Sequence, residues 1–423
     1  MTALWRAYGV GHFGKSLMWH SSELLFAFYL TEVCRMAPQV MGAVLASALF
    51  ASGLMDIAVG HLLRTHARSV RSAAGVQAWG ACGAGLAFFL FLGMELLFGG
   101  QHVIAAMAIG LVFRLAYAFY DVPQNAILSL APGGDRLRAG LASLRFVCSG
   151  LASLAIAGAA ALLLAHARPS AAFAALGAIV GITAVSTALG FLWVARSATA
   201  GWPLAAASAA PASSQDVSAA RTRRGLVRLL GLAFGVSACA VVFTKLEPYF
   251  AAYILTTQAA RGTLLAAVAC GGIASQPVTF WVASRWNVPV ACRVCAMSAI
   301  AGAGAFLLPG TGAVAWLPAT GFLVGFGLQG LGMLLWTAVA NLTSASARTP
   351  APLAPTVVFG LLTFSQKCAS ALGTLAIGAI LGAHQAGAAN TGRLAPVVLA
   401  MGAVPLACAL VGLVFARHLK PLG

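Results

Sequence analysis

One stretch of sequence decides the fold: residues 103–130, which read VIAAMAIGLVFRLAYAFYDVPQNAILSL. About 20 apolar residues are enough for a helix to cross a hydrocarbon core of ~30 Å. Asp121 lies inside this stretch and is one of only eight acidic residues in the chain. An ionisable group at bilayer depth costs about 2.5 to 3.5 kcal/mol on insertion scales, and such groups usually mark the path of an ion or a substrate. The stretch therefore predicts a membrane-spanning helix with a functional carboxylate.

The same apolar pattern extends along the whole chain of 423 residues. Hydrophobic residues make up 61% of the chain and charged residues 8%, a composition that excludes a soluble globular protein. The pattern predicts an all-α membrane protein with twelve transmembrane helices, for which we expect these spans: 10–33, 39–63, 73–98, 103–130, 140–165, 170–195, 228–255, 260–284, 288–308, 312–343, 354–383 and 393–416.

One segment interrupts the pattern. Residues 196–227 are rich in Ala, Ser and Pro and end in several arginines, which is typical of a flexible cytoplasmic linker. It divides the chain into a predicted N-terminal six-helix bundle over 1–195 and a C-terminal six-helix bundle over 228–423. This arrangement resembles the major facilitator fold, whose two halves are parallel repeats that rock about a central site.

The net charge of +17 bears on topology and partners. The Lys and Arg residues are spread over loops instead of forming one basic domain, so we expect no nucleic acid as partner. Most of them fall on the side that holds both termini, which the positive-inside rule assigns to the cytoplasm. We expect a monomer in an inner (plasma) membrane, with a small-molecule substrate and the lipid bilayer as partners.

The sequence contains no nucleophile-and-base motif, phosphate-binding Gly loop or metal-ligand cluster, so neither an enzyme nor a cofactor is expected.

The first predicted span has one polar face. Its members follow helical spacing: His12, Lys15, Ser16, Trp19, His20 and Glu23. Such a face does not contact lipid, so it meets either a water-filled cavity or other polar helices. A network that only fixes the packing of helices is the alternative to a binding site. His12 and Lys15 lie near the predicted cytoplasmic end, where they can also snorkel to the surface.

Two acids in later spans are candidate cation ligands. Asp121 and Asn125 share a helical face, and Pro123 between them frees a backbone carbonyl. A carboxylate, an amide oxygen and a carbonyl are the hard oxygen ligands that a small cation accepts. The alternative is a structural salt bridge from Asp121 to Arg114 or Arg145.

The other acid, Asp56, is followed by the basic loop with Arg64 and Arg68. It either binds the cation or pairs with these loop arginines to brace a gate. Arg145 and Lys367 come from opposite halves of the chain, where they can hold a solute from two sides or neutralise an acid.

At these residues the sequence resembles the glycoside-pentoside-hexuronide:cation symporter family, the melibiose permease-like family of the major facilitator superfamily. The resemblance covers nearly the whole chain and is carried by these motifs: Tyr8-Gly9-Val10-Gly11-His12-Phe13-Gly14-Lys15, Asp56 with Gly60, Tyr117 with Asp121-Val122-Pro123, Arg145-Phe146, and Gln366-Lys367 before Ala371-Leu372-Gly373.

The resemblance implies a role for each matching residue. Asp56 and Asp121 would bind the coupling ion, and they would be its metal ligands if that ion is Na⁺; the other candidate ion is H⁺. By the resemblance Arg145 and Lys367 would line the substrate pocket, and Tyr117 and Trp336 also match the family. From their places on the polar helical faces, and not from the resemblance, we add these expected substrate-binding residues: Asn125, Ser16, His20 and Glu23.

The chain also departs from the family pattern. Ser52 replaces a second acid of the cation site and Met55 replaces an amide, which makes a proton at least as good a candidate as sodium. Ser16 stands where a sugar-binding acid is expected and Asn125 where a stacking Trp is expected, which argues against a galactoside.

We therefore expect a secondary active transporter that couples a cation to a small sugar-like or anionic organic solute by alternating access. Two alternatives stay open. One is a proton-coupled exporter of an amphipathic metabolite or drug, and the other is a membrane scaffold or sensor that transports nothing.

Overall fold

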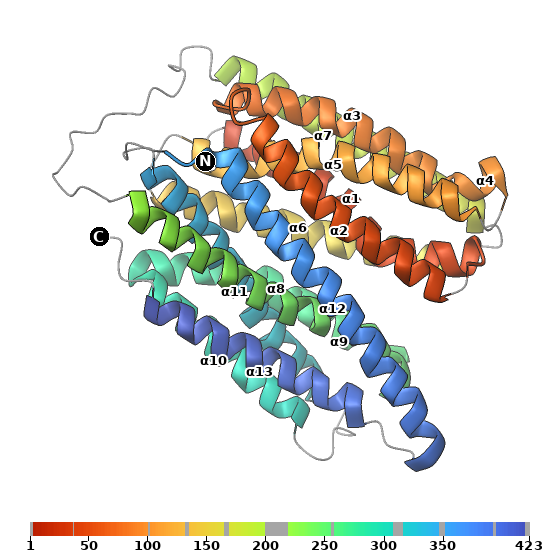
Figure 1. The fold of residues 1–423 in the computed structure, drawn as a ribbon. Coiled ribbons are helices and arrows are strands. Elements are labelled where there is room, and N and C mark those ends of the chain that lie inside the picture. The colour runs from red at the N-terminus through yellow and green to blue at the C-terminus, as the bar shows by residue number, and fades with distance from the viewer. Residues whose placement is uncertain are drawn as a thin grey trace. The chain divides into compact units, whose positions relative to one another are not determined.

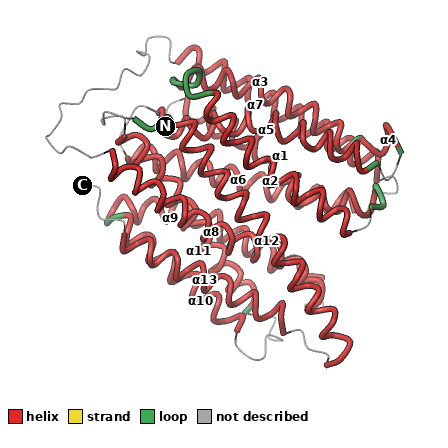
Figure 2. The backbone as a smooth tube through the Cα atoms, in the orientation of Figure 1, coloured by secondary structure: helices red, strands yellow, loops and turns green. Residues whose placement is uncertain are grey.

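The computed structural model describes residues 3–36, 38–99, 102–131, 135–164, 169–198, 219–254, 258–307, 316–346, 352–391 and 395–418. All regular structure in these ranges is helical (Figure 2). The elements are α1 (Ala3–Phe28), η1 (Tyr29–Val33), α2 (Pro38–Leu62), α3 (Val70–Leu92), α4 (Met94–Phe98), α5 (Val103–Leu130), α6 (Asp135–Leu164), α7 (Pro169–Ala198), α8 (Ala219–Ile254), α9 (Gln258–Arg285), α10 (Val288–Leu307), α11 (Leu317–Ser346), α12 (Pro355–Thr391) and α13 (Ala395–His418).

The long helices match the twelve predicted spans one for one. Twelve helices in the described part of the chain are between 20 and 37 residues long, while α4 has only five residues. Nine of the described helices are long and apolar enough by themselves to cross a membrane. Helix α1 is not among these nine, and it is the helix that carries the predicted polar face.

The predicted linker lies mostly outside the described residues, which omit 199–218. Its two ends were predicted wrongly. Helix α7 continues to Ala198, and α8 begins at Ala219, so Arg221, Arg223 and Arg224 are helical. The reason is that Ala and Arg are strong helix formers, so a charged segment that lowers hydropathy does not end a helix.

By its contacts the described chain forms two compact units. Unit 1 comprises residues 1–226 and 339–367, and unit 2 comprises residues 227–338 and 368–423. These units differ from the two predicted bundles, because residues 339–367 group with the N-terminal helices. Specific contacts explain the grouping: the hydroxyl of Thr356 donates to the carbonyl of Gly60 at 2.8 Å, and Arg138 Nε donates to Asn341 Oδ1 at 2.9 Å.

Within unit 1, α3 packs between α5 and α7 (Figure 1). Helix α1 contacts α6 and α7, and α2 contacts α5. Four rings from α1, α3 and α5 form the centre of this unit: Phe26, Phe88, Phe91 and Phe113. Large apolar side chains such as Ile104 and Trp79 are more than four-fifths exposed, as expected for a surface that faces acyl chains.

The contact between α3 and α5 depends on Gly80. A Cβ atom at this position would lie 2.4 Å from the backbone nitrogen of Tyr120, so no other residue fits without displacing a helix. Since Tyr120 precedes Asp121, this close approach fixes the distance between α3 and the part of α5 that carries the candidate carboxylate. In unit 2, α10 packs against α9 and α13.

We expect Gly80→Ala to lower the free energy of unfolding by about 1 to 3 kcal/mol, the usual effect of overpacking. Gly75→Ala on the same helix is the matched control, because a Cβ there meets nothing within 4 Å. Thermal unfolding of both variants in detergent measures the difference. Equal melting temperatures for the two variants would show that α3 and α5 do not approach as closely as described.

Candidate functional site

The carboxylate of Asp121 on α5 forms a buried ion pair with Lys15 of α1. Lys15 Nζ also donates a hydrogen bond to Asn125 Oδ1 at 3.0 Å. Asp121 and Asn125 therefore act on the same ammonium group, as their shared helical face predicts. The structure decides two of the alternatives: Asp121 forms its ion pair with Lys15, and Lys15 does not snorkel but is only 3% exposed.

Asp56 on α2 forms a second buried pair. Lys367 Nζ of α12 lies 2.6 Å from Asp56 Oδ2 and donates to Ser52 Oγ at 2.9 Å. A Cβ at Gly360 would lie 2.5 Å from the carbonyl oxygen of Asp56, so this glycine lets α12 approach α2 closely enough for the pair to form. Asp56 does not pair with the loop arginines, since the Arg68 side chain instead donates to the backbone of Arg64.

The two pairs belong to one electrostatic cluster. Asp121 interacts with Lys367 and Arg145 as well as with Lys15, and Asp56 interacts with Asp121. All five side chains are buried. The cluster therefore brings the ammonium groups of Lys15 and Lys367 and the guanidinium of Arg145 near two carboxylates in a region of low dielectric.

The polar face of α1 meets polar partners on two other helices. His20 Nε2 lies 2.9 Å from Ser149 Oγ on α6, and Glu23 Oε1 lies 3.4 Å from Arg114 Nη2 on α5. With the pairing of Lys15, the face therefore meets polar side chains of other helices, which is one of the two environments that the sequence left open. Ser16 and His12 on the same face are also buried.

Trp19 was absent from the predicted binding residues, although it lies on the same face of α1. Its ring is 6.0 Å from the Tyr117 ring, and both Lys367 Nζ at 5.8 Å and the Arg114 guanidinium at 5.6 Å lie over it. Its helical spacing was the available signal. The ring lies among the charged groups, so α1 provides the kind of aromatic surface that Asn125 cannot provide on α5.

The remaining predicted substrate-binding residues lie in different parts of the described chain. Tyr117 is buried beside Tyr120 and Phe113, and Arg145 lies over the ring of Phe146 at 6.0 Å. Trp336 is buried in α11 within unit 2.

No group of three or more His, Cys, Asp or Glu side chains in the described ranges could hold a metal ion. An ion at the two carboxylates would therefore need other oxygen ligands, such as Ser52 or Asn125.

Comparison with known proteins agrees with this architecture. A family model described as MFS/sugar transport protein matches residues 7–420. The comparison with curated protein sequences gives no match.

Several solved structures share the fold. A bacterial homologue of the iron transporter ferroportin, in an outward-facing state, has a TM-score of 0.69 and 15% identity over 99% of this chain and 100% of that chain. The major facilitator superfamily transporter FucP, also outward, has a TM-score of 0.68 and 12% identity over 98% of each chain. XylE has a TM-score of 0.64 and 12% identity over 99% of this chain and 95% of that chain. At such identities the likeness establishes the major facilitator fold.

Proposed function

Because the chain belongs to the MFS/sugar transport protein family, whose members are transporters and not enzymes, we propose that it couples the movement of an anionic, sugar-like solute to that of Na⁺ or H⁺. The observation that carries this proposal is the pairing of the two candidate ion-binding carboxylates with lysines. Asp121 binds Lys15, and Asp56 binds Lys367.

The pairs provide a physical basis for coupling. A proton or a sodium ion competes with the ammonium group for each carboxylate. When the ion binds, the lysine is released and can bind an anionic solute. Ion and solute then raise each other's affinity, because coupling between two binding sites is reciprocal. A transporter with this linkage moves the two ligands together.

The positive charge that is left after an ion binds supports an anionic solute. Once an ion neutralises Asp56 or Asp121, the two ammonium groups of Lys15 and Lys367 exceed the negative charge of the remaining carboxylate. A carboxylate or sulfonate on a sugar-sized molecule would compensate them, and Trp19 offers a ring for its apolar face. Such charge-assisted hydrogen bonds are about twice as strong as neutral ones.

The oxygen ligands near the carboxylates bear on the identity of the ion. Sodium would need Asn125 and Ser52 to complete its coordination, whereas a proton needs only a carboxylate oxygen. Two of the structurally similar proteins are described as proton symporters, XylE for xylose and E. coli FucP for fucose. We place H⁺ first and Na⁺ second.

The protein is a multi-pass integral membrane protein. We propose that both termini lie in the cytoplasm of a cell with an inner (plasma) membrane. The basic start of α8, with Arg221, Arg223 and Arg224, supports this orientation by the positive-inside rule.

Uptake into proteoliposomes tests the proposal. We expect glucuronate or a comparable sugar acid to accumulate when a proton or sodium gradient is imposed. A gradient of one pH unit corresponds to about 1.4 kcal/mol, which permits up to about tenfold accumulation for one proton per solute. The corresponding neutral sugar is the control for charge. Uptake that ignores both gradients would remove the claim of symport.

A further inference from the structure

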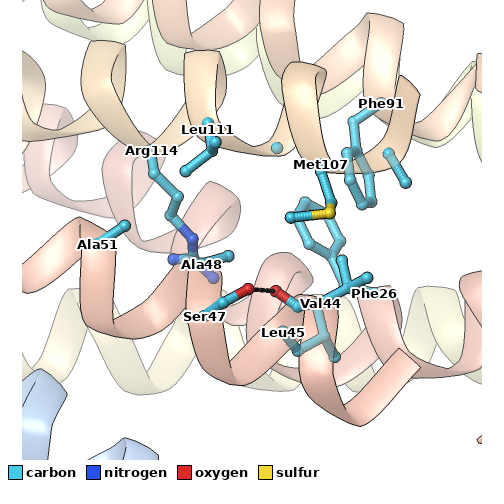
Figure 3. A pocket seen from close by; sticks show the side chains of 12 residues that line it. Phe26, Val44, Leu45, Ser47, Ala48, Ala51, Phe91, Met107, Leu111 and Arg114 are labelled. Carbon is cyan, nitrogen blue, oxygen red and sulfur yellow. Dashed lines mark hydrogen bonds between the residues drawn. The ribbon is translucent and has the colours of Figure 1, made fainter. Parts of the chain in front are cut away.

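An apolar pocket of about 250 Å³ lies within unit 1 and is lined by residues of α1, α2, α3 and α5 (Figure 3). Its walls include Phe26, Val44, Ala48, Met107 and Leu111. Ser47 also lines it, but the hydroxyl of Ser47 donates to the carbonyl of Val44 at 3.0 Å, so this polar group is already satisfied.

One charged side chain enters this pocket. The Arg114 guanidinium is directed towards Ala48 (Figure 3), and the residue is only 3% exposed. Arg114 Nη2 is 3.4 Å from Glu23 Oε1, a long distance for an ion pair. Arg114 Nη1 is buried and makes no hydrogen bond to any described residue. Because a guanidinium has five N–H donors, a buried one in an apolar wall favours a further acceptor oxygen.

The pocket is elongated along α5, with this charge at one end. Its α5 residues run from Ala106 to Arg114, which corresponds to about 12 Å along a helix at 1.5 Å per residue. Ser47 and Met107 at its rim are exposed, so the pocket can be reached from outside the helices. The shape and the charge together suit a ligand with an apolar chain and one polar end.

We propose that this pocket binds an amphipathic monoanion, a molecule with one alkyl chain and a terminal carboxylate or similar oxyanion. The oxyanion accepts hydrogen bonds from Arg114, whose planar fork of donors matches a carboxylate better than a hydroxyl group. The chain lies along Leu111, Met107 and Val44. Because Glu23 holds the same guanidinium only at long distance, the bound oxyanion competes with it for Nη2.

The same chemistry is available from two sources: an anionic lipid of the bilayer or a free amphiphile such as a fatty acid. A membrane that contains only zwitterionic lipid separates them. We would reconstitute the protein in phosphatidylcholine nanodiscs and add decanoate that carries a photoreactive diazirine at the end of its chain. Mass spectrometry of the digested protein then identifies the labelled residues.

We expect the label on peptides of α2 and α5 that contain Val44 and Met107. Unlabelled decanoate should compete at least tenfold better than decanol or decyltrimethylammonium, because only the carboxylate pairs with Arg114. When phosphatidylglycerol is added to the nanodiscs, loss of labelling identifies a bilayer lipid as the source, and unchanged labelling identifies a free amphiphile.

A matched pair of variants and one double variant make the test specific. Ala48→Phe fills the pocket and should abolish labelling, whereas Ala46→Phe on the same helix lies outside its lining and should leave labelling unchanged. Arg114→Gln combined with Glu23→Gln removes both charges of this contact and should reduce labelling about tenfold. Thermal unfolding of each variant shows whether it is folded.

The proposal is overturned if decanol competes as well as decanoate, or if Ala46→Phe and Ala48→Phe behave alike. Labelling spread over all exposed helices would overturn it as well. Labelling requires no ion gradient, and Asp121→Asn should retain it. Failure of this binding site is therefore distinguishable from failure of the proposed symport.

Discussion

Asp121→Asn should reduce gradient-driven uptake at least a hundredfold and should also destabilise the protein. The substitution removes the carboxylate that an ion must occupy and leaves Lys15 buried with Asn125 as its remaining acceptor. Removing one partner of a buried ion pair costs about 3 to 5 kcal/mol, since the other charge stays buried without compensation. Uptake into proteoliposomes and thermal unfolding measure the two effects separately.

A double variant separates function from folding. Asp121→Asn with Lys15→Met removes both members of the ion pair, so the melting temperature should return most of the way to the native value. Uptake should stay absent, because the ion still lacks its ligand. If Asp121→Asn alone transports at the native rate, the carboxylate has no part in coupling, and a scaffold or sensor becomes the better interpretation.

Lys367→Met should change the affinities for ion and solute in opposite directions. Without the ammonium group at 2.6 Å, nothing competes with an ion for Asp56, so the ion should bind more tightly. The solute loses one of its proposed cationic partners, and its affinity should fall about tenfold or more, as expected for one charge-assisted hydrogen bond. Thermal stabilisation by sodium, by protons and by the solute, titrated separately, measures all three affinities.

The matched control is Lys367→Arg, which keeps the positive charge but changes its geometry. It should bind the ion no more tightly than the native protein. If Lys367→Met instead weakens ion and solute binding together, then the lysine supports both ligands directly, and competition between ion and ammonium is not the mechanism.

The long helices could be predicted well because an apolar run must have a minimum length to cross a bilayer. The span expected at 103–130 has the bounds of α5. The family resemblance, which was read from motifs between Tyr8 and Gly373, is confirmed by the family match. Hydropathy did not predict the start of α8 at Ala219, which lies inside the expected linker. The free energy of transferring a segment into lipid differs from the free energy of forming a helix. Hydropathy reports only the transfer free energy.

The candidate site was predictable by residue type but not by pairing. The sequence indicated Asp121, Asp56 and the basic residues, because charged groups in apolar segments are costly. It could not assign partners, since Lys15 and Asp121 are 106 residues apart and any of several cations had the right charge. Arg114 was one of two alternative salt-bridge partners for Asp121, and it contacts Glu23 instead. Helix packing, fixed by contacts such as that of Gly80, decides which charges meet.

The helix α12 also bears on whether either half of the chain could exist alone. Lys367 follows the linker in sequence, yet it neutralises a carboxylate that precedes the linker. A fragment that ends at Ala198 would therefore contain a buried Asp56 without its counter-ion. Such a fragment should be degraded when it is expressed by itself, and co-expression of the complementary fragment should rescue it. Lys367 would then stabilise the first half only after the second half has assembled with it.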